Sequence, residues 1–291
     1  IFFTNNKDMG YCCWAKVFTS GCKVYYQQHM QIGINKKDII HTLRYKVLDA
    51  WISPLKWLAD EVKEQTNMPH SKIVCIPLGI ETENLLSQSV GKEQARNFWG
   101  IKSNMPLIGI IGRLDIQKNQ HLLIEAAKIL KDRDIIIDLL IVGEPTRDTE
   151  HLNYSKNLRD MVQKFNMEDH VHFHPFTNKI TTFYEALDIF VMATNKETYG
   201  MVTLESMLLG TPVIASNAGG TPEILGYGKF GTLFESGNAK DLAEKIMYAL
   251  ENKEIINEKA QSANKIVLQK FDYRSECKQI TELIKSTGVS K

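Results

Sequence analysis

The chain has 291 residues, of which 43% are hydrophobic and 24% charged, as in an ordinary soluble globular protein. This length allows two domains, each with its own core. The net charge of +1 argues against a nucleic-acid binder, because such proteins usually carry a strong positive excess. Residues 1–72 are mildly basic, at +4. This excess indicates either a weak peripheral contact with an anionic membrane surface or a solvated basic face.

The cysteines and the apolar segments indicate the cellular compartment of the protein. The five cysteines form no CxxC pair, and an odd number suits a reducing cytosol. No apolar run approaches the ~20 residues that span a bilayer, and no signal peptide is recognised. Ile1-Phe2-Phe3-Thr4 resembles the middle of a strand, so we expect residues in front of it. We predict a cytoplasmic protein, with a peripheral position at the inner face of the membrane as the alternative.

The first part of the chain alternates short strands and helices. Strands are expected at 1–4, 23–30, 50–53 and 72–78, and helices at 11–18, 37–48 and 54–65, the last beginning at Pro54. Such alternation predicts a parallel sheet with right-handed crossovers. We therefore predict a partial Rossmann-like domain over residues 1–90. A polar stretch follows, and we interpret 91–105 as a linker with a short helix at 93–99.

The second part repeats the alternation more regularly. Strands are expected at 106–112, 135–143, 170–175, 188–194, 212–216 and 230–234, and helices at 119–133, 151–165, 179–187, 222–225, 238–251, 254–269 and 273–286. We predict a complete doubly wound domain over residues 106–270. Residues 271–291 are expected to form a final helix that packs back toward the first domain. The fold class is thus α/β, with two doubly wound parallel-sheet domains, the N-terminal one incomplete.

Two carboxylates flank the start of a predicted helix after strand 188–194. Glu197 lies in the turn at the carboxyl end of the strand, where open α/β sheets bind ligands. Glu205 lies about one turn into the helix. Between them, Tyr199, Gly200 and Met201 place free backbone N–H groups at a helix N-terminus, which suits phosphate. Thr198 and Val202, on either side, are also expected to bind the donor. Taken alone, the pattern is equally consistent with a solvated loop glutamate and a helix-surface glutamate.

Two cations follow strand 106–112. Gly112 permits close backbone approach, and Arg113 and Lys118 are expected at the same sheet edge as Glu197. A departing diphosphate needs positive charge where negative charge develops. The alternative is a pair of surface cations beside a loop.

The runs IGIIGRLDIQKNQHLLIEA and ETYGMVTLESMLLGTPVIASNAGGTPEIL resemble the donor-site signatures of retaining glycosyltransferase family 4, the group 1 transferases of GT-B fold. The resemblance is strong from Pro106 to Leu250 and weaker from Lys23 to Gly79. It implies a donor-binding second domain and an acceptor-side first domain.

The resemblance also implies roles for single residues. Those matching Arg113 and Lys118 hold the donor diphosphate, and that matching Glu205 binds the nucleotide ribose. Glu197 matches a contact of the donor sugar, and the amides of 199–202 complete the phosphate site. The remaining expected donor residues are Gly143, His174 and Phe176 near the base, and Gly219 and Gly220 near the sugar. His29 resembles a histidine near the reacting anomeric carbon; a structural histidine is the alternative.

The implied activity is transfer of a hexosyl or amino-hexosyl group from a UDP- or GDP-sugar to a glycan or lipid-linked hydroxyl. The family's favoured mechanism is front-face, with Glu197, His29, Arg113 and Lys118 as the catalytic set and no metal or other cofactor. Asp132-Arg133-Asp134 and the His170, His172, His174 series match metal patterns, but their context is wrong for a site. A sugar-nucleotide epimerase, a phosphorylase and a non-catalytic nucleotide-binding module remain alternatives.

Two departures from the family pattern matter. Leu78-Gly79 stands where many members have Asn-Gly. The family's first strand and Gly-rich acceptor loop have no counterpart, so we expect these 291 residues to bind donor but to transfer poorly. The base, sugar, acceptor, linkage and oligomeric state are not specified by the sequence.

Overall fold

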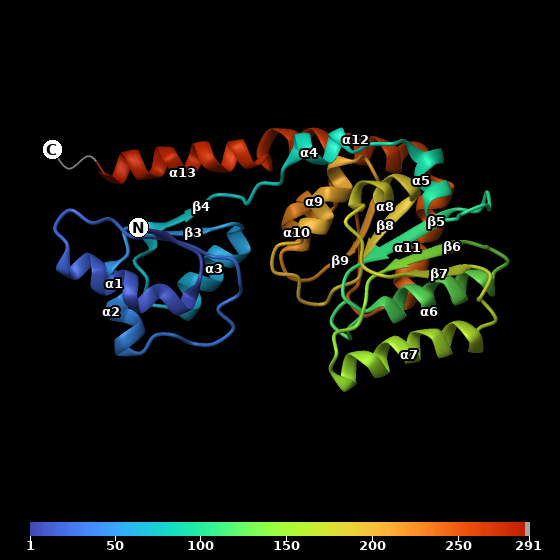
Figure 1. Ribbon diagram of the computed structural model, residues 1–291, viewed down its shortest axis with the longest axis horizontal. Helices are drawn as coiled ribbons and strands as arrows, with labels where there is room; N and C mark the ends of the chain where they lie inside the picture. Colours follow the sequence, from blue (N-terminus) through green and yellow to red (C-terminus); the bar gives the residue numbers. More distant parts are fainter. Residues whose placement is uncertain (289–291) are drawn as a thin grey trace. The chain divides into compact units, whose positions relative to one another are not determined.

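The computed structural model describes residues 1–288, and the chain divides into two compact units. Unit 1 comprises residues 1–80 and 269–291, and unit 2 comprises residues 81–268. Both are parallel α/β structures (Figure 1), which confirms the predicted fold class. Within residues 1–288, no helix is both long and apolar enough to cross a bilayer.

Unit 1 is built on a sheet of four parallel strands in the order β1-β2-β3-β4. Its elements are β1 (Phe2–Phe3), α1 (Met9–Phe18), β2 (Tyr25–Gln27), α2 (Ile39–Val47), β3 (Ala50–Ser53), α3 (Lys56–Gln65), β4 (Ile73–Cys75) and α13 (Tyr273–Gly288). The core is aromatic: Tyr26 and Tyr45 both meet the ring of Trp51 edge-on, at 4.7 and 5.3 Å between centroids. Such pairs add about 0.5–1.5 kcal/mol beyond their burial.

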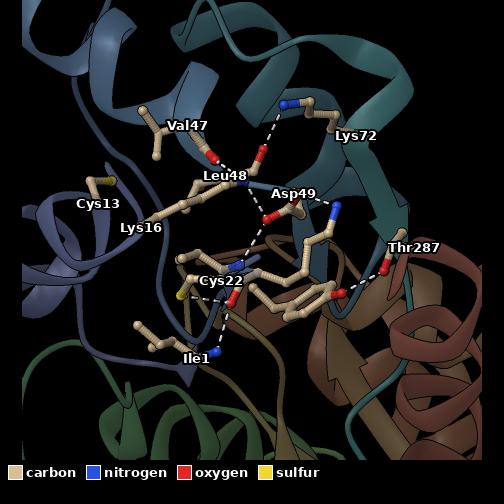
Figure 2. A network of polar contacts seen from close by, with 12 residues as sticks. Ile1, Cys13, Lys16, Cys22, Val47, Leu48, Asp49, Lys72 and Thr287 are labelled. Carbon is tan, nitrogen blue, oxygen red and sulfur yellow. Dashed lines mark hydrogen bonds and ion pairs between the residues drawn. The ribbon is translucent and has the colours of Figure 1, made fainter. Parts of the chain in front are cut away.

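A polar network joins the amino ends of these strands (Figure 2). Asp49, just before β3, accepts from Lys16 Nζ at 2.5 Å, Lys23 Nζ at 3.4 Å and the amide of Val24 at 2.8 Å. Lys72, just before β4, donates to the carbonyl of Leu48 at 2.6 Å. The network therefore ties three strands and α1 together at the edge opposite the strands' carboxyl ends.

The backbone at Gly79 explains why the last helix belongs to unit 1. Ile80 donates to the carbonyl of Phe271 at 2.8 Å and accepts from the amide of Tyr273 at 3.1 Å. A Cβ on Gly79 would overlap the backbone of Tyr273, so only glycine permits this approach. Glu276 then binds the amide of Gly79 at 2.7 Å.

Unit 2 contains a six-stranded parallel sheet in the order β10-β9-β8-β5-β6-β7. Its elements are α4 (Thr82–Ser87), α5 (Lys92–Phe98), β5 (Leu107–Ile111), α6 (Gln120–Lys131), β6 (Asp138–Val142), α7 (Thr149–Lys164), β7 (Val171–His174), α8 (Ile180–Ala186), β8 (Ile189–Met192), α9 (Met201–Leu208), β9 (Val213–Ser216), α10 (Thr221–Ile224), β10 (Thr232–Phe234), α11 (Ala239–Glu251) and α12 (Lys253–Lys270). Figure 1 shows α6 and α7 on one side of the sheet and α8 on the other. The strand order reverses between β5 and β8, and their carboxyl ends form the crevice where such sheets bind ligands.

Two local expectations differ from the structure. Helix α3 begins at Lys56, because Leu55 is buried with an extended backbone (φ −136°, ψ 152°); Pro54 therefore precedes the helix rather than starting it. Residues 91–105, predicted as a linker, lie in unit 2. Their helix α5 packs on α8, and Lys92 Nζ binds Asp188 at 2.6 Å.

Candidate functional site

The loop after β5 is organised by a buried carboxylate. Asp115, 1% exposed, accepts from the amides of Gln117 and Lys118 at 3.0 and 3.1 Å through Oδ1. Its Oδ2 accepts from Arg113 Nε at 2.6 Å. The side chain of Arg113 is half exposed. Because Asp115 binds only the Nε edge, the terminal nitrogens of Arg113 are available for a second bidentate partner.

Two glycines bring the ends of β5 and β6 into backbone contact. Gly112 and Gly143 have φ of +145° and +150°, a region that side chains rarely allow. A Cβ on Gly143 would overlap the carbonyl oxygen of Gly112. The bare backbone here lets a bulky anion approach the sheet edge closely.

The loop after β8 is packed against the Gly219-Gly220 turn. Gly220 donates its amide to the carbonyl of Glu197 at 2.9 Å, and a Cβ on Gly219 (φ +61°) would overlap that same oxygen. Gly200, with φ of +91°, then starts α9. The first amides of a helix have no intrahelical acceptor, so Met201 and Val202 direct N–H groups out of the helix end.

The loops after β5 and β8 meet through an ion pair. Lys118 Nζ lies 3.0 Å from Glu197 Oε2, and the two side chains are 29% and 18% exposed. The stem of Lys118 passes over Gly112, whose Cβ would lie 3.7 Å from Lys118 Cδ. Lys118 and Glu197, which follow different strands of the sheet, thus lie in contact.

A cavity of about 480 Å³ is lined by Gly112, over which the stem of Lys118 passes, but neither Lys118 nor Glu197 belongs to its wall. It collects six of the predicted donor residues: Gly112, Arg113, Gly143, Phe176, Val202 and Glu205. Phe176 is 68% exposed, which leaves its ring available for stacking. The cavity thus combines a carboxylate, a guanidinium, bare backbone and an aromatic ring. Such groups can contact the hydroxyls, the phosphates and the base of a nucleotide.

Glu205 is held by a partner that no sequence pattern indicated. The hydroxyl of Tyr184, on α8, donates to Glu205 Oε2 at 2.9 Å. Burial raises the pKa of Glu205, and the Tyr184 hydrogen bond opposes that rise. The pKa of Tyr184 itself lies well above its usual range, because the ring is fully buried beside the Glu205 carboxylate.

The remaining predicted residues have other surroundings. His174 ends β7 with its ring edge-on to Trp99, at 4.9 Å between centroids, and does not line the cavity. Burial, with a smaller effect of His172, lowers its pKa. The side chain of Tyr199 is buried, Thr198 is partly buried and Met201 is exposed. His29, in unit 1, is exposed in the loop after β2.

The cavity wall also includes residues that were not predicted. Glu144, Pro145 and Thr146 follow β6, and Thr177 and Ile180 lead into α8. Their only sequence signal is position, since each follows a strand of the same sheet at its carboxyl end. Asp115 had a further signal, because an acid two residues after Arg113 can reach its guanidinium.

The metal-like patterns are engaged in other contacts. Asp132 binds Lys128 Nζ at 2.5 Å at the end of α6, and His170 Nδ1 lies 2.8 Å from Asp138. Within residues 1–288, no group of three or more His, Cys, Asp or Glu side chains is placed to hold a metal ion.

The sequence model of the family described as "Glycosyl transferases group 1" matches residues 91–266. The chain belongs to the group 1 glycosyltransferases. The matched range contains the whole cavity wall, Lys118 and Glu197. It begins at α5, which agrees with the packing of α5 on unit 2.

Curated relatives carry several different names within this family. D-inositol 3-phosphate glycosyltransferase of Corynebacterium urealyticum is 27% identical over 232 residues, which are 78% of this chain and 54% of that protein. Mannosylfructose-phosphate synthase of Agrobacterium fabrum is 26% identical over 217 residues, 73% of this chain and 47% of that protein. The chain spans about half the length of the curated relatives that it matches.

Solved structures show the same fold. A glycosyltransferase of Rickettsia africae matches 100% of this chain and 77% of its own, with a TM-score of 0.88 at 20% identity. HepE of Anabaena, solved in complex with UDP, matches 98% of this chain and 78% of its own, with a TM-score of 0.83 at 22% identity. The group 1 chain therefore has the GT-B type of fold, with a four-stranded sheet in unit 1.

Proposed function

We propose that this group 1 glycosyltransferase uses a nucleotide diphosphate sugar as donor and transfers its hexosyl or amino-hexosyl group with retention of configuration. One observation carries the proposal: a single cavity joins Glu205 and Arg113 to bare glycine backbone, and Lys118, paired with Glu197, passes over one of those glycines, Gly112. A carboxylate suits ribose hydroxyls, and the two cations suit a diphosphate.

Each group has a defined task in the proposed reaction. Glu205 accepts hydrogen bonds from the ribose, while Gly112, Gly143 and the amides of α9 approach the phosphates. Arg113 and Lys118 stabilise the charge that grows on the diphosphate as the glycosidic bond breaks, with no metal required. The leaving phosphate assists removal of the acceptor proton on the same face of the sugar. Glu197 orients the sugar and is not the attacking group.

Donor binding is the first test. A thermal-shift panel of UDP-, GDP- and ADP-sugars in EDTA selects the donor, and calorimetry then compares Glu205→Ala and Lys118→Ala with the wild-type chain. We expect both variants to lose measurable donor binding. Glu244→Ala is the control, because this side chain is exposed on α11, outside the cavity wall, and lies 3.5 Å from Arg133. Wild-type affinity in both test variants would overturn the proposal.

The alternatives differ in their products. A sugar-nucleotide epimerase alters the donor with no acceptor present, and a phosphorylase depends on inorganic phosphate. A non-catalytic module binds nucleotide and turns over nothing. The anomeric configuration of the product, read by NMR, tests retention directly.

We also propose that the acceptor is a hydroxyl of a glycan or a lipid-linked glycan, reached from the cytoplasmic face of a membrane. The support is an α1–α2 apolar surface, which we define as the exposed side chains of Tyr11, Trp14, Val17, Phe18, Ile39, Ile40 and Leu43. The two helices are neighbours, joined by Cys13 Sγ and the carbonyl of Arg44 at 3.3 Å. Exposed cations on and beside these helices complement anionic lipid: Lys7, Lys37, Arg44 and Lys46.

Sedimentation with vesicles tests this contact. We expect binding to phosphatidylglycerol vesicles that weakens with salt and is lost in the double variant Trp14→Ser, Phe18→Ser. Leu152→Ser, which changes an apolar side chain 50% exposed on α7, should bind as the wild type does. Equal binding to phosphatidylcholine vesicles, or none to either kind, would contradict the proposal.

A further inference from the structure

The hydroxyl of Tyr184 hydrogen-bonds a residue of the donor cavity. Tyr184 lies on α8 with no exposed surface, and it donates to Glu205 Oε2 at 2.9 Å. The two residues are 21 positions apart and belong to different helices. The bond therefore ties Glu205, the α9 residue that lines the cavity, to helix α8.

The tyrosine ring is held rigidly by its neighbours. It meets Phe183 at 5.1 Å and Phe190 at 5.2 Å between centroids, with interplanar angles of 71° and 81°. The carbonyl of Tyr184 also accepts from Thr211 Oγ1 at 2.9 Å. A ring packed on two sides and anchored at its backbone cannot swing, so its hydroxyl is a fixed donor.

Glu205 needs such a donor. A partly buried carboxylate has four lone-pair positions, and without a donor its long side chain would sample several rotamers. Tyr184 occupies one position on Oε2 and leaves the others for hydroxyl groups in the cavity. The remaining charged groups of the cavity wall are Arg113, which pairs with Asp115, and Glu144.

We propose that Tyr184 is a positioning residue for donor recognition: it holds the Glu205 carboxylate in the orientation that accepts the ribose hydroxyls. This inference rests on the proposed donor site and adds a residue that does not touch the donor. A tyrosine that merely fills the core would contribute only to folding. The two roles are distinguishable because Tyr184→Phe keeps the ring and removes only the hydroxyl.

The protonation of Glu205 supplies an independent readout. Burial raises the pKa of this carboxyl and the hydrogen bond from Tyr184 lowers it. Loss of the hydroxyl therefore raises the pKa further. Since the ionised form is the better acceptor, donor affinity in the Tyr184→Phe variant should begin to fall at a higher pH than in the wild-type chain.

The experiment compares ribonucleotides with their 2′-deoxy counterparts. Calorimetry of the full chain with UDP, GDP and ADP identifies the bound nucleotide, which is then compared with its 2′-deoxy form. In the wild-type chain, loss of the 2′-hydroxyl should cost about tenfold in affinity. In Tyr184→Phe, the ribonucleotide should bind about tenfold more weakly and the preference over the 2′-deoxy form should shrink toward unity.

Tyr154→Phe is the matched control. Tyr154 is partly buried in unit 2, and its hydroxyl bonds the amide and Nδ1 of His121 at 3.2 and 2.9 Å, outside the cavity wall. This variant should change neither the affinity nor the ribose preference. Urea unfolding confirms that both variants are folded.

The outcomes distinguish the proposed donor site from the positioning role of Tyr184. If the wild-type chain binds none of the three nucleotides, the proposed donor site itself fails. If it binds and Tyr184→Phe keeps the wild-type affinity, ribose preference and pH profile, the positioning role is overturned while the donor site stands. A uniform loss of affinity with unchanged ribose preference and pH profile would also overturn it, because a structural role alone gives that result.

Discussion

Lys118 Nζ and Glu197 Oε2 are 3.0 Å apart, so the cation proposed to bind the donor phosphate is engaged by the carboxylate proposed to bind the donor sugar. A diphosphate must take Lys118 from Glu197, and the exchange leaves Glu197 free for a sugar hydroxyl. A partly exposed pair of this kind is worth about 0.2–1 kcal/mol.

Glu197→Gln should therefore tighten the binding of UDP or GDP by about 1.5- to 5-fold while lowering turnover of the complete donor sugar. The substitution releases Lys118 and removes a negative charge near the phosphates. Calorimetry with the nucleoside diphosphates measures the gain. Weaker nucleoside diphosphate binding in Glu197→Gln would contradict the exchange.

Gly219→Ala should destabilise unit 2 by on the order of 3 kcal/mol and abolish donor binding, because its Cβ would overlap the carbonyl oxygen of Glu197. Gly237→Ala separates this overlap from the conformational cost. Gly237 also has positive φ, +79°, but nothing lies within 4 Å of its Cβ position. Urea unfolding should show a loss of about 1–2 kcal/mol for Gly237→Ala, with donor binding retained. Equal losses would show that the approach of the Gly219 turn to Glu197 is not tight.

The sheet of unit 2 was predictable because its strands are short apolar runs that are buried on both faces, such as β6 and β8. Parallel order then places the ends of β5 and β8 at one crevice, which is why Arg113, Lys118 and Glu197 could be grouped from sequence. The linker was harder to predict. Residues 91–105 are polar, yet Lys92 is held to unit 2 by Asp188, 96 positions later.

Tyr184 illustrates what a sequence pattern does not contain. Helix α8 has buried residues nearly all round, so an apolar face does not single out one ring. The proposed role of the Tyr184 hydroxyl depends on Glu205 of α9 lying next to it. The residue spacing within α8 cannot predict that contact. The same limit applies to His174. This residue was expected near the nucleotide base, but its ring packs on Trp99, at the end of α5.

Asp115→Asn should weaken nucleoside diphosphate binding by about tenfold with little loss of stability. Asparagine keeps its one oxygen for the amides of Gln117 and Lys118 and then presents an N–H donor, which cannot accept from Arg113 Nε. Asp115→Ala should lose both functions and destabilise the loop as well. Calorimetry and urea unfolding on the same samples separate the two effects. Unchanged affinity in Asp115→Asn would show that this carboxylate does not orient Arg113 for binding.

Asp49 offers a test of unit 1 by pH. Burial alone would raise the pKa of this carboxyl, but hydrogen bonds from Lys16, the Val24 amide and Lys23 bring it below its usual value (Figure 2). A group whose folded pKa is depressed contributes stability above its unfolded pKa, about 3.9, and loses it as the pH falls through the folded pKa. Protection of the β2 and β3 amides from hydrogen exchange should therefore decline as the pH falls below about 4.

Asp49→Asn should remove that decline and lower the local unfolding free energy at pH 7 by about 1–3 kcal/mol, since Lys16 and Lys23 lose a charged acceptor. Asp60→Asn is the control. Asp60 binds Lys63 at 2.6 Å, but it is 62% exposed, so water replaces the pair at little cost. Hydrogen exchange followed by mass spectrometry resolves the amides of unit 1 from those of unit 2. If both substitutions reduce protection of β2 and β3 equally, charge at the surface rather than the Asp49 network stabilises this end of the sheet.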